Sequence, residues 1–270
     1  GVVLAGGFSR RMGRDKALER LAGPPPEGCA EDVPGGHDGS MLGRIHSLVR
    51  SLVPVCFVSC REDTPRQGYD CVFDAVQGVG PTAGLQAALR RAQETGYAAV
   101  LALSCDLPLM DAPTLRQLLA ARAAAPATCL VTAYRERHTG RVESLVAVYE
   151  VGALPYFDGA LVQGQRRLAS VIPQELHFFL DYGPEEAAPF FNCNSPEDLA
   201  QARAREMNLQ IEPVSLQEFV VRTAGGPAVP RHGDPWPVLD LPARCAVLVA
   251  AVHSGGTADA LVEACRRMAQ

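Results

Sequence analysis

Short apolar runs alternate with amphipathic segments along most of the chain. Runs dominated by apolar residues, typical of strands buried in a parallel sheet, predict strands over 1–5, 55–59, 71–73, 98–103, 128–133 and 144–149. Apolar residues three and four positions apart predict helices over 41–52 and 83–95, and a basic segment over 9–21 begins another helix. Strands that alternate with helices in this way predict an α/β fold, a three-layer sandwich with a mostly parallel sheet.

Two further helices carry clear start signals. Asp111 can cap a helix that begins at the next residue. Ser195 is followed by a proline and two acids, which combines a hydroxyl cap, a rigid first turn and negative charge at the positive end of the helix dipole. We therefore expect helices that start near 112 and 196.

Two segments rich in proline and glycine interrupt the alternation. The first, 23–40, has no apolar periodicity and is expected to be a surface loop or a disordered insertion in the main domain; the second, at 223–243, is similar. We expect one domain over 1–207 and a small C-terminal appendage over 208–270, with a helix at 215–221, a strand at 245–252 and a helix from 257. So few elements form little core, and the sequence assigns this extension no role.

Composition and charge exclude several classes of protein. Thirty acidic and 25 basic residues give a net charge of −5, which argues against a broad non-specific grip on nucleic acid. The longest apolar stretches fall far short of the roughly 20 residues of a membrane helix. Nine scattered cysteines without a C-x-x-C pair are typical of reduced thiols rather than a zinc site. We expect a cytoplasmic protein without nucleic-acid or membrane partners.

Polar residues follow several of the expected strands, where open α/β sheets bind their ligands. The most informative segment is LAGGFSRRMGRDK at 4–16, in which a strand leads into paired glycines and a basic loop. The glycines let backbone N–H groups approach a phosphate or a base edge, and Arg10, Arg11 and Lys16 add positive charge around a triphosphate. The spacing matches neither the Walker motif nor G-x-G-x-x-G. For a glycine pair alone, a tight strand–helix turn with solvated arginines is the alternative.

Four further motifs follow in order. Asp74 precedes GPTAGL at 80–85, and then come CDLP at 105–108, GQRR at 164–167 and FNCNSPEDL at 191–199. Together with the segment at 4–16, this series resembles the signature of the molybdenum cofactor guanylyltransferases (MobA-type) and covers about 1–206. The resemblance implies a Rossmann-like nucleotidyltransferase domain over 1–207.

The resemblance also implies an activity and its residues. The enzyme would transfer GMP from GTP to molybdenum-bound molybdopterin, with Mg²⁺ as cofactor, and form the guanine dinucleotide cofactor and pyrophosphate. Lys16 and Asp106 would be catalytic, and Asp106 would hold the metal. The nucleotide would contact Leu4, Ala5, Gly6, Gly7, Lys16, Asp74, Gly84 and Asp106. Molybdopterin would contact Arg166, Arg167, Asn192 and Asn194.

Local chemistry agrees with these assignments but leaves alternatives. Asp106 follows the most buried strand, where a carboxylate suits Mg²⁺, although an Asp before Leu-Pro also favours a turn. Asn192 and Asn194 would share one face of a strand, and their amides suit a pterin edge; a turn is the alternative. Arg166 and Arg167 would anchor the molybdopterin phosphate or lie on a solvated helix face.

Departures from the family pattern keep other functions open. Ser59 stands where some relatives have Asn, and 142–144 replaces a segment that often contains proline. A cytidylyl- or sugar-phosphate nucleotidyltransferase of the same fold is one alternative, although Leu4 in place of Thr points toward guanine. Another is a non-catalytic nucleotide-binding adaptor that serves a molybdoenzyme or its chaperone, with the C-terminal extension as docking module. Intact Lys16, Asp74 and Asp106 argue against the adaptor.

Overall fold

A computed structural model describes residues 1–6, 15–21, 39–74, 80–206, 209–213 and 219–223 of the chain. The described residues form two units. The first contains nearly all of them up to Asn192, and the second begins at Cys193. The domain boundary expected after residue 207 stays a prediction.

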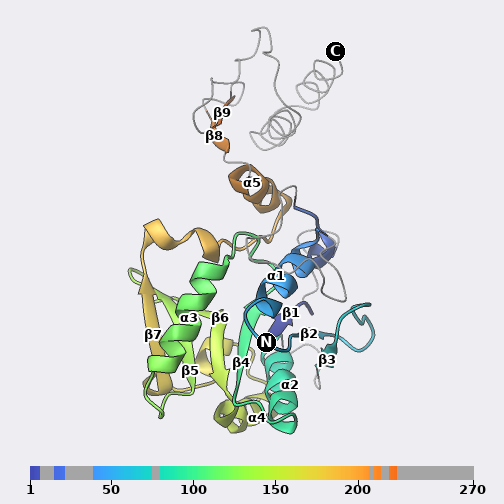
Figure 1. Ribbon diagram of the computed structural model, residues 1–270, viewed down its shortest axis with the longest axis vertical. Coiled ribbons are helices and arrows are strands. Elements are labelled where there is room, and N and C mark those ends of the chain that lie inside the picture. Colours follow the sequence, from blue (N-terminus) through green and yellow to red (C-terminus); the bar gives the residue numbers. More distant parts are fainter. Residues whose placement is uncertain (7–14, 22–38, 75–79, 207–208, 214–218, 224–270) are drawn as a thin grey trace. The chain divides into compact units, whose positions relative to one another are not determined.

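The first unit is built on a seven-stranded sheet with the strand order β3-β2-β1-β4-β6-β5-β7 (Figure 1). β1 is parallel to β2 and β4, β3 is parallel to β2, and β7 is parallel to β5. β6 is antiparallel to both of its neighbours, β4 and β5. Six strands therefore share one direction, and the predicted mostly parallel sheet is confirmed. The strands are β1 (Val2–Leu4), β2 (Phe57–Cys60), β3 (Cys71–Phe73), β4 (Ala99–Ser104), β5 (Val131–Glu136), β6 (Val142–Glu150) and β7 (His177–Tyr182).

Helices cover both faces of this sheet. α1 (Met41–Arg50) and α3 (Ala112–Ala124) pack on one face, and α2 (Pro81–Glu94) and α4 (Leu154–Val162) pack on the other. Each helix buries an apolar stripe, such as Leu42, Ile45 and Leu48 of α1. The central strands are buried on both sides, which explains why their sequences are apolar throughout. The predicted three-layer sandwich is confirmed (Figure 1).

Side-chain caps fix where two of the helices begin. Asp111 Oδ1 accepts a hydrogen bond of 2.8 Å from the Thr114 N–H, as the sequence predicts for α3. Ser40 Oγ accepts one of 3.0 Å from the Gly43 N–H, so Ser40, which the sequence assigns to a loop, is the N-cap of α1. Each cap satisfies an N–H group that has no partner within its own helix.

Some predicted elements differ from the structure. The hydrophobic pattern does not predict α4 or β7. The helix expected at 215–221 is wrong because β9 (Phe219–Thr223) pairs with β8 (Leu209–Pro213) as an antiparallel hairpin. The run Phe-Val-Val is aromatic and β-branched, which favours a strand. The only described helical part of the segment at 9–21 is the 3-10 turn η1 (Lys16–Leu18). The elements expected at 245–252 and from 257 lie outside the described residues, as do 9–14 and most of the loop at 23–40.

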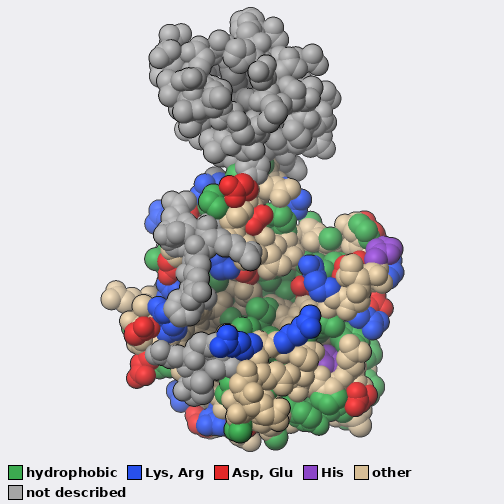
Figure 2. All heavy atoms as spheres, turned by 180° about the vertical axis from the view of Figure 1, so that it is seen from behind, with side chains coloured by type: hydrophobic (Ala, Val, Ile, Leu, Met, Phe, Trp, Pro, Cys, Tyr) green, Lys and Arg blue, Asp and Glu red, His purple; other side chains and the backbone are tan. Residues whose placement is uncertain are grey.

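The sequence argues against nucleic-acid and membrane partners, and the surface and the helices of the structure can be compared with that expectation. Figure 2 shows the Lys and Arg side chains of the visible described surface in small groups, separated by acidic, apolar and other side chains. None of the helices that the structure describes combines the length and apolar character needed to cross a membrane. The six cysteines among the described residues are free thiols.

Candidate active site

The candidate site lies at one edge of the sheet, where β1, β2, β3 and β4 end side by side. Ala5 and Gly6 follow β1, Asp74 follows β3, and Asp106 comes two residues after β4. Parallel strands bring their carboxyl ends to the same edge, and loops there bind ligands in open α/β sheets. The topology thus gathers residues from distant parts of the sequence.

Lys16 and Asp106 form the central contact of this edge. Lys16 Nζ donates to Asp106 Oδ2 at 2.5 Å, and the two side chains are only 16% and 11% exposed. The other carboxylate oxygen, Oδ1, is buried and has no hydrogen-bond partner among the described residues. A buried oxygen left without a partner is costly, so this atom marks a place where a ligand could supply the missing contact.

The donor set at Asp106 fits a magnesium ion. Mg²⁺ prefers oxygen ligands and is usually held by one or two carboxylates together with water and substrate phosphates. In the described part of the chain, no three His, Cys, Asp or Glu side chains cluster as a metal site. A single carboxylate with a free oxygen therefore fits an ion that shares its coordination with a phosphate ligand.

Asp74 lies in a second polar group, on the side of the site next to α2. Ser59 Oγ donates to Asp74 Oδ1 at 3.0 Å. A Cβ atom added to Gly84 would lie 2.1 Å from Ser59 Oγ and 3.0 Å from Asp74 Oδ1. Burial raises the pKa of Asp74, and the hydrogen bond from Ser59 offsets part of this rise. Gly84 thus permits α2 to approach a partly buried carboxylate closely.

The backbone at the end of β1 is largely engaged in the protein's own hydrogen bonds. The Leu4 carbonyl accepts from the Cys105 N–H, and the Ala5 N–H donates to the Ser59 carbonyl. Gly6 is the first residue here whose backbone makes no hydrogen bond with other described residues, so it is the most available of the three predicted nucleotide contacts. Gly7 lies outside the described residues.

Arg66, which the sequence analysis did not single out, connects two parts of this edge. Its Nη1 lies 2.5 Å from Asp15 Oδ2, and its Nη2 donates to the Ala5 carbonyl at 3.0 Å. Asp15 Oδ1 accepts from the Ala17 N–H at 3.1 Å and caps η1. In the sequence, Arg66 is one of several charged residues in a polar segment, so the pattern alone does not separate it from Arg61.

The arginines predicted to hold molybdopterin lie in a turn rather than on a helix. Arg166 and Arg167 are exposed and follow the end of α4. Gln165 closes the turn because its Nε2 donates to the Ser170 carbonyl at 2.8 Å. The alternative of a solvated helix face is therefore wrong, because α4 ends at Val162.

The two asparagines do not lie in a strand, so the prediction that they share one strand face is wrong. Asn192 is exposed and its Nδ2 donates to the Phe190 carbonyl at 3.2 Å. Asn194 belongs to the second unit, where its backbone N–H donates to Asp198 Oδ2 at 2.8 Å. The start of α5 (Pro196–Glu206) organises this segment, because Asp198 also accepts from the Ser195 N–H.

Glu143 is another buried polar residue that the sequence analysis missed as a candidate. Its Oε1 accepts from Tyr182 at 2.6 Å and from Arg141 Nη2 at 2.7 Å. β6 runs opposite to β4, so its first residues lie at the carboxyl edge of the parallel strands. Burial and this hydrogen bond raise the pKa of Tyr182 to about 12. Glu143 therefore adds a second well-anchored carboxylate to the same edge of the sheet.

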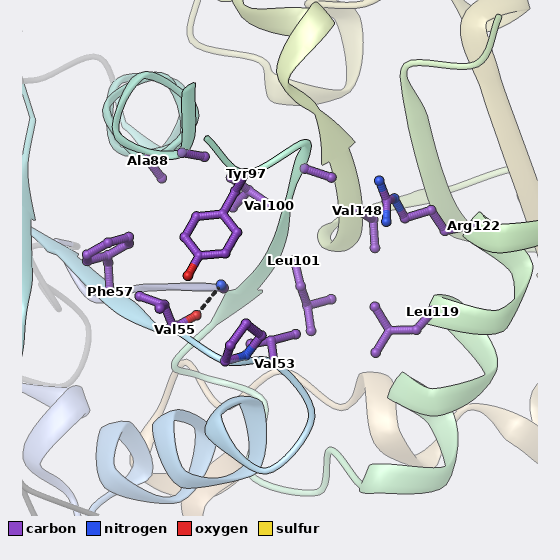
Figure 3. A pocket seen from close by; sticks show the side chains of 14 residues that line it. Val53, Val55, Phe57, Ala88, Tyr97, Val100, Leu101, Leu119, Arg122 and Val148 are labelled. Atoms are coloured by element: carbon purple, nitrogen blue, oxygen red, sulfur yellow. Dashed lines mark hydrogen bonds between the residues drawn. The ribbon is translucent and has the colours of Figure 1, made fainter. Parts of the chain in front are cut away.

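A separate cavity of about 120 Å³ lies at the opposite edge, where β1, β2 and β4 begin (Figure 3). Its lining is mostly apolar, and Figure 3 shows Val53, Leu101, Leu119 and Val148 around it, with Arg122 at one side. None of the predicted site residues contributes to this lining. The candidate active site is thus the carboxyl edge and not this cavity.

Comparison with known proteins identifies the family. The model of the MobA-like NTP transferase domain matches residues 1–263. The chain belongs to this family. It is a nucleotidyltransferase of the MobA-like type, and the family predicted from the five motifs is confirmed.

Curated relatives of this MobA-like enzyme cover most of its length. A molybdenum cofactor guanylyltransferase of Rhodobacter capsulatus is 30% identical over 209 residues, which are 76% of this chain and 95% of the relative. A probable molybdenum cofactor guanylyltransferase of Opitutus terrae is 31% identical over 212 residues, with the same two shares.

Solved structures share its fold. Molybdopterin-guanine dinucleotide biosynthesis protein A from Archaeoglobus fulgidus has a TM-score of 0.55 at 23% identity and covers 76% of this chain and 96% of its own. A 2-C-methyl-D-erythritol 4-phosphate cytidylyltransferase from Thermus thermophilus has a TM-score of 0.50 at 15% identity and covers 76% of this chain and 97% of its own. A molybdopterin-guanine dinucleotide biosynthesis protein and a cytidylyltransferase thus share this fold.

Proposed function

We propose that this MobA-like enzyme transfers GMP from GTP to molybdenum-bound molybdopterin in the cytoplasm, with Mg²⁺ as cofactor. The products are the guanine dinucleotide cofactor and pyrophosphate. The names of the curated relatives support this reaction. The observation that carries the proposal is the pair of Lys16 and Asp106 at the carboxyl edge, with one buried Asp106 oxygen that lacks a partner among the described residues.

The reaction requires positioning and charge stabilisation rather than proton transfer. An oxygen of the terminal phosphate of molybdopterin forms a bond to the α-phosphorus of GTP, and the bond from that phosphorus to the bridging oxygen of the β-phosphate breaks. Pyrophosphate leaves with the electron pair of the broken bond. The attacking phosphate is already anionic near neutral pH, so no side chain need act as a base. Catalysis therefore depends on holding the two anions together.

The chain's own residues supply that positioning. Lys16 would bind the phosphates of GTP, and Asp106 would hold the metal. When bound, Mg²⁺ would neutralise charge on the phosphates and orient them. Gly6 offers backbone groups to the nucleotide. The missing side chain at Gly84 lets α2 lie close to Asp74, which also lies near Gly6.

The acceptor would be held by residues outside this central pair. The exposed guanidinium groups of Arg166 and Arg167 offer positive charge and several N–H donors to the molybdopterin phosphate. The amide groups of Asn192 and Asn194 offer both a donor and an acceptor to the pterin. These roles rest on the family resemblance of their motifs.

Pyrophosphate release tests the proposal directly. The full chain is assayed with Mg²⁺ and molybdenum-loaded molybdopterin, with GTP or CTP as the nucleotide. We expect release with GTP; release with CTP alone would replace the proposal with a cytidylyl transfer. Binding of GTP without release from either nucleotide would instead favour an adaptor for a molybdoenzyme.

Asp106→Asn provides the matching test of the site. The change removes the negative charge while it keeps the size of the side chain, so turnover should fall by about 100-fold or more. Asp111→Asn is the control, because it makes the same change in the segment after β4 and Asn is an equally good helix cap. Near-normal turnover by Asp106→Asn would contradict the metal assignment.

A further inference from the structure

Arg66 makes two hydrogen bonds that join segments far apart in the sequence. One terminal nitrogen contacts Asp15, 51 residues earlier, and the other contacts the Ala5 carbonyl, 61 residues earlier. The side chain is only 13% exposed. Arg66 is therefore a partly buried link between the segment after β2, the end of β1 and the start of η1.

Burial of the Arg66 guanidinium costs solvation free energy. A guanidinium removed from water loses favourable hydration, and Arg66 Nε is buried without a hydrogen-bond partner among the described residues. The rigid fork of the guanidinium suits two acceptors at once, which a lysine ammonium cannot match in geometry. The structure thus uses an arginine where a smaller apolar residue would avoid the cost of burial, which points to a role beyond packing.

The two acceptors lie on either side of the proposed nucleotide-binding segment. Ala5 directly precedes Gly6, the residue with available backbone groups, and Asp15 directly precedes Lys16. Asp15 also caps η1, the turn that carries Lys16. Arg66 therefore joins the residue before Gly6 to the residue before Lys16.

We propose that Arg66 is a positioning residue that neutralises Asp15, so that Lys16 can bind the anionic triphosphate. Asp15 is 37% exposed and carries a negative charge next to Lys16 in the chain. Without Arg66, this carboxylate would compete with the phosphates for Lys16 and would repel them. The inference rests on the proposed function, because it requires that a nucleoside triphosphate binds at this edge.

A coupling between Arg66 and Asp15 in the KM for GTP, without a matching coupling in the melting temperature, is the signature that a purely structural ion pair would not produce. Arg66→Met removes the charge and the fork but keeps an unbranched apolar side chain; we expect the KM for GTP to rise about tenfold, with a smaller change in kcat. In the double variant with Asp15→Asn, the unpaired charge is gone, so most of the KM increase should disappear. Arg66→Lys keeps the positive charge but loses the fork, so its KM for GTP should lie between those of the wild type and of Arg66→Met.

A matched control separates this effect from the loss of any buried ion pair. Arg122 Nε and Nη2 donate to the two oxygens of Glu150 at 2.6 and 2.9 Å, at the opposite edge of the sheet (Figure 3). Arg122→Met should therefore leave the KM for GTP unchanged. Steady-state kinetics is paired with thermal denaturation of every variant and with direct measurement of the GTP dissociation constant.

The outcomes distinguish a failure of the proposed function from a failure of the proposed role of Arg66. A wild-type chain that binds GTP but releases no pyrophosphate contradicts the proposed function, and the dissociation constants of the variants still test Arg66. An unchanged GTP affinity in Arg66→Met overturns the role of Arg66 while the proposed function stands. If the effects of Arg66→Met and Asp15→Asn on the GTP dissociation constant are strictly additive, the proposed role of Arg66 is overturned as well.

Discussion

Asp74 carries its charge in surroundings that favour the protonated form. Burial raises its pKa, and the hydrogen bond from Ser59 compensates only in part. When the folded-state pKa lies above the unfolded one, stability is complete below the unfolded pKa and is lost as the pH rises through the folded value. At neutral pH the ionised Asp74 therefore lowers the stability of the fold, which is expected of a group retained to contact a ligand.

Asp74→Asn should separate stability from function. We expect the variant to melt roughly 1–3 °C above the wild type at pH 7 and to bind GTP more weakly. The difference in melting temperature should shrink as the pH falls through the raised pKa of Asp74. Thermal denaturation between pH 4 and 8 measures the first effect, and nucleotide titration measures the second.

Asp181 is a control because its pKa is shifted in the opposite direction from that of Asp74. Arg135 donates to both of its carboxylate oxygens and lowers the pKa of Asp181. Its stabilising contribution is present above the unfolded pKa and is lost as the pH falls through the folded value. Asp181→Asn should thus be no more stable than the wild type at pH 7. A stability gain in both variants would contradict our interpretation of Asp74.

Several residues of the candidate site could be singled out from the sequence because they stand in recognisable motifs. Asp74 and Asp106 follow the ends of β3 and β4, and Lys16 in η1 reaches Asp106 at the same edge. Arg66 and Glu143 could not be predicted in this way, since each acts through partners far away in the chain. A contact between distant residues leaves no periodic signal in a single sequence.

At the scale of elements, α2 approaches the sheet closely where Gly84 faces Ser59 and Asp74. A Cβ atom at position 84 would lie within 2.1 Å of Ser59 Oγ, so an alanine there requires that the helix or the serine moves. We expect Gly84→Ala to lower the free energy of unfolding by about 1–3 kcal/mol. It should also weaken GTP binding because it displaces Asp74. Urea denaturation and nucleotide titration measure the two effects.

Gly159 in α4 is the matched control for this substitution. A Cβ atom at that position would meet nothing within 4 Å. Alanine has a higher helix propensity than glycine by about 1 kcal/mol, so Gly159→Ala should leave stability unchanged or raise it. Equal losses at positions 84 and 159 would show that the close approach of α2 is not the cause.

The periodicity of the sequence predicted most elements of the sheet and its covering helices, and the reasons for the exceptions are local. α4 contains a proline and a glycine within nine residues, which weakens a helical pattern. β7 is half-buried over most of its length, so its alternation is faint. The turn at 165–170 is closed by a glutamine side chain, and no periodicity marks such a bond.

At the scale of the whole molecule, the chain is longer than the regions that its curated relatives match. The Rhodobacter and Opitutus relatives align over 209 and 212 residues, or 76% of this chain, yet these regions are 95% of the relatives themselves. The family model, in contrast, extends to residue 263. The two comparisons therefore differ in how much of the chain they cover.

A chain that ends at residue 207 tests whether the residues beyond that point contribute to catalysis. All predicted site residues, from Leu4 to Asn194, precede this point, and α5 ends at Glu206. We therefore expect the shortened chain to release pyrophosphate with a KM for GTP within about twofold of the full chain and to keep its cooperative thermal transition. If folding is retained but turnover is lost, then the residues beyond 207 contribute to catalysis. A loss of the transition itself would assign them to the core, because a fold that lacks part of its core loses its all-or-none melting.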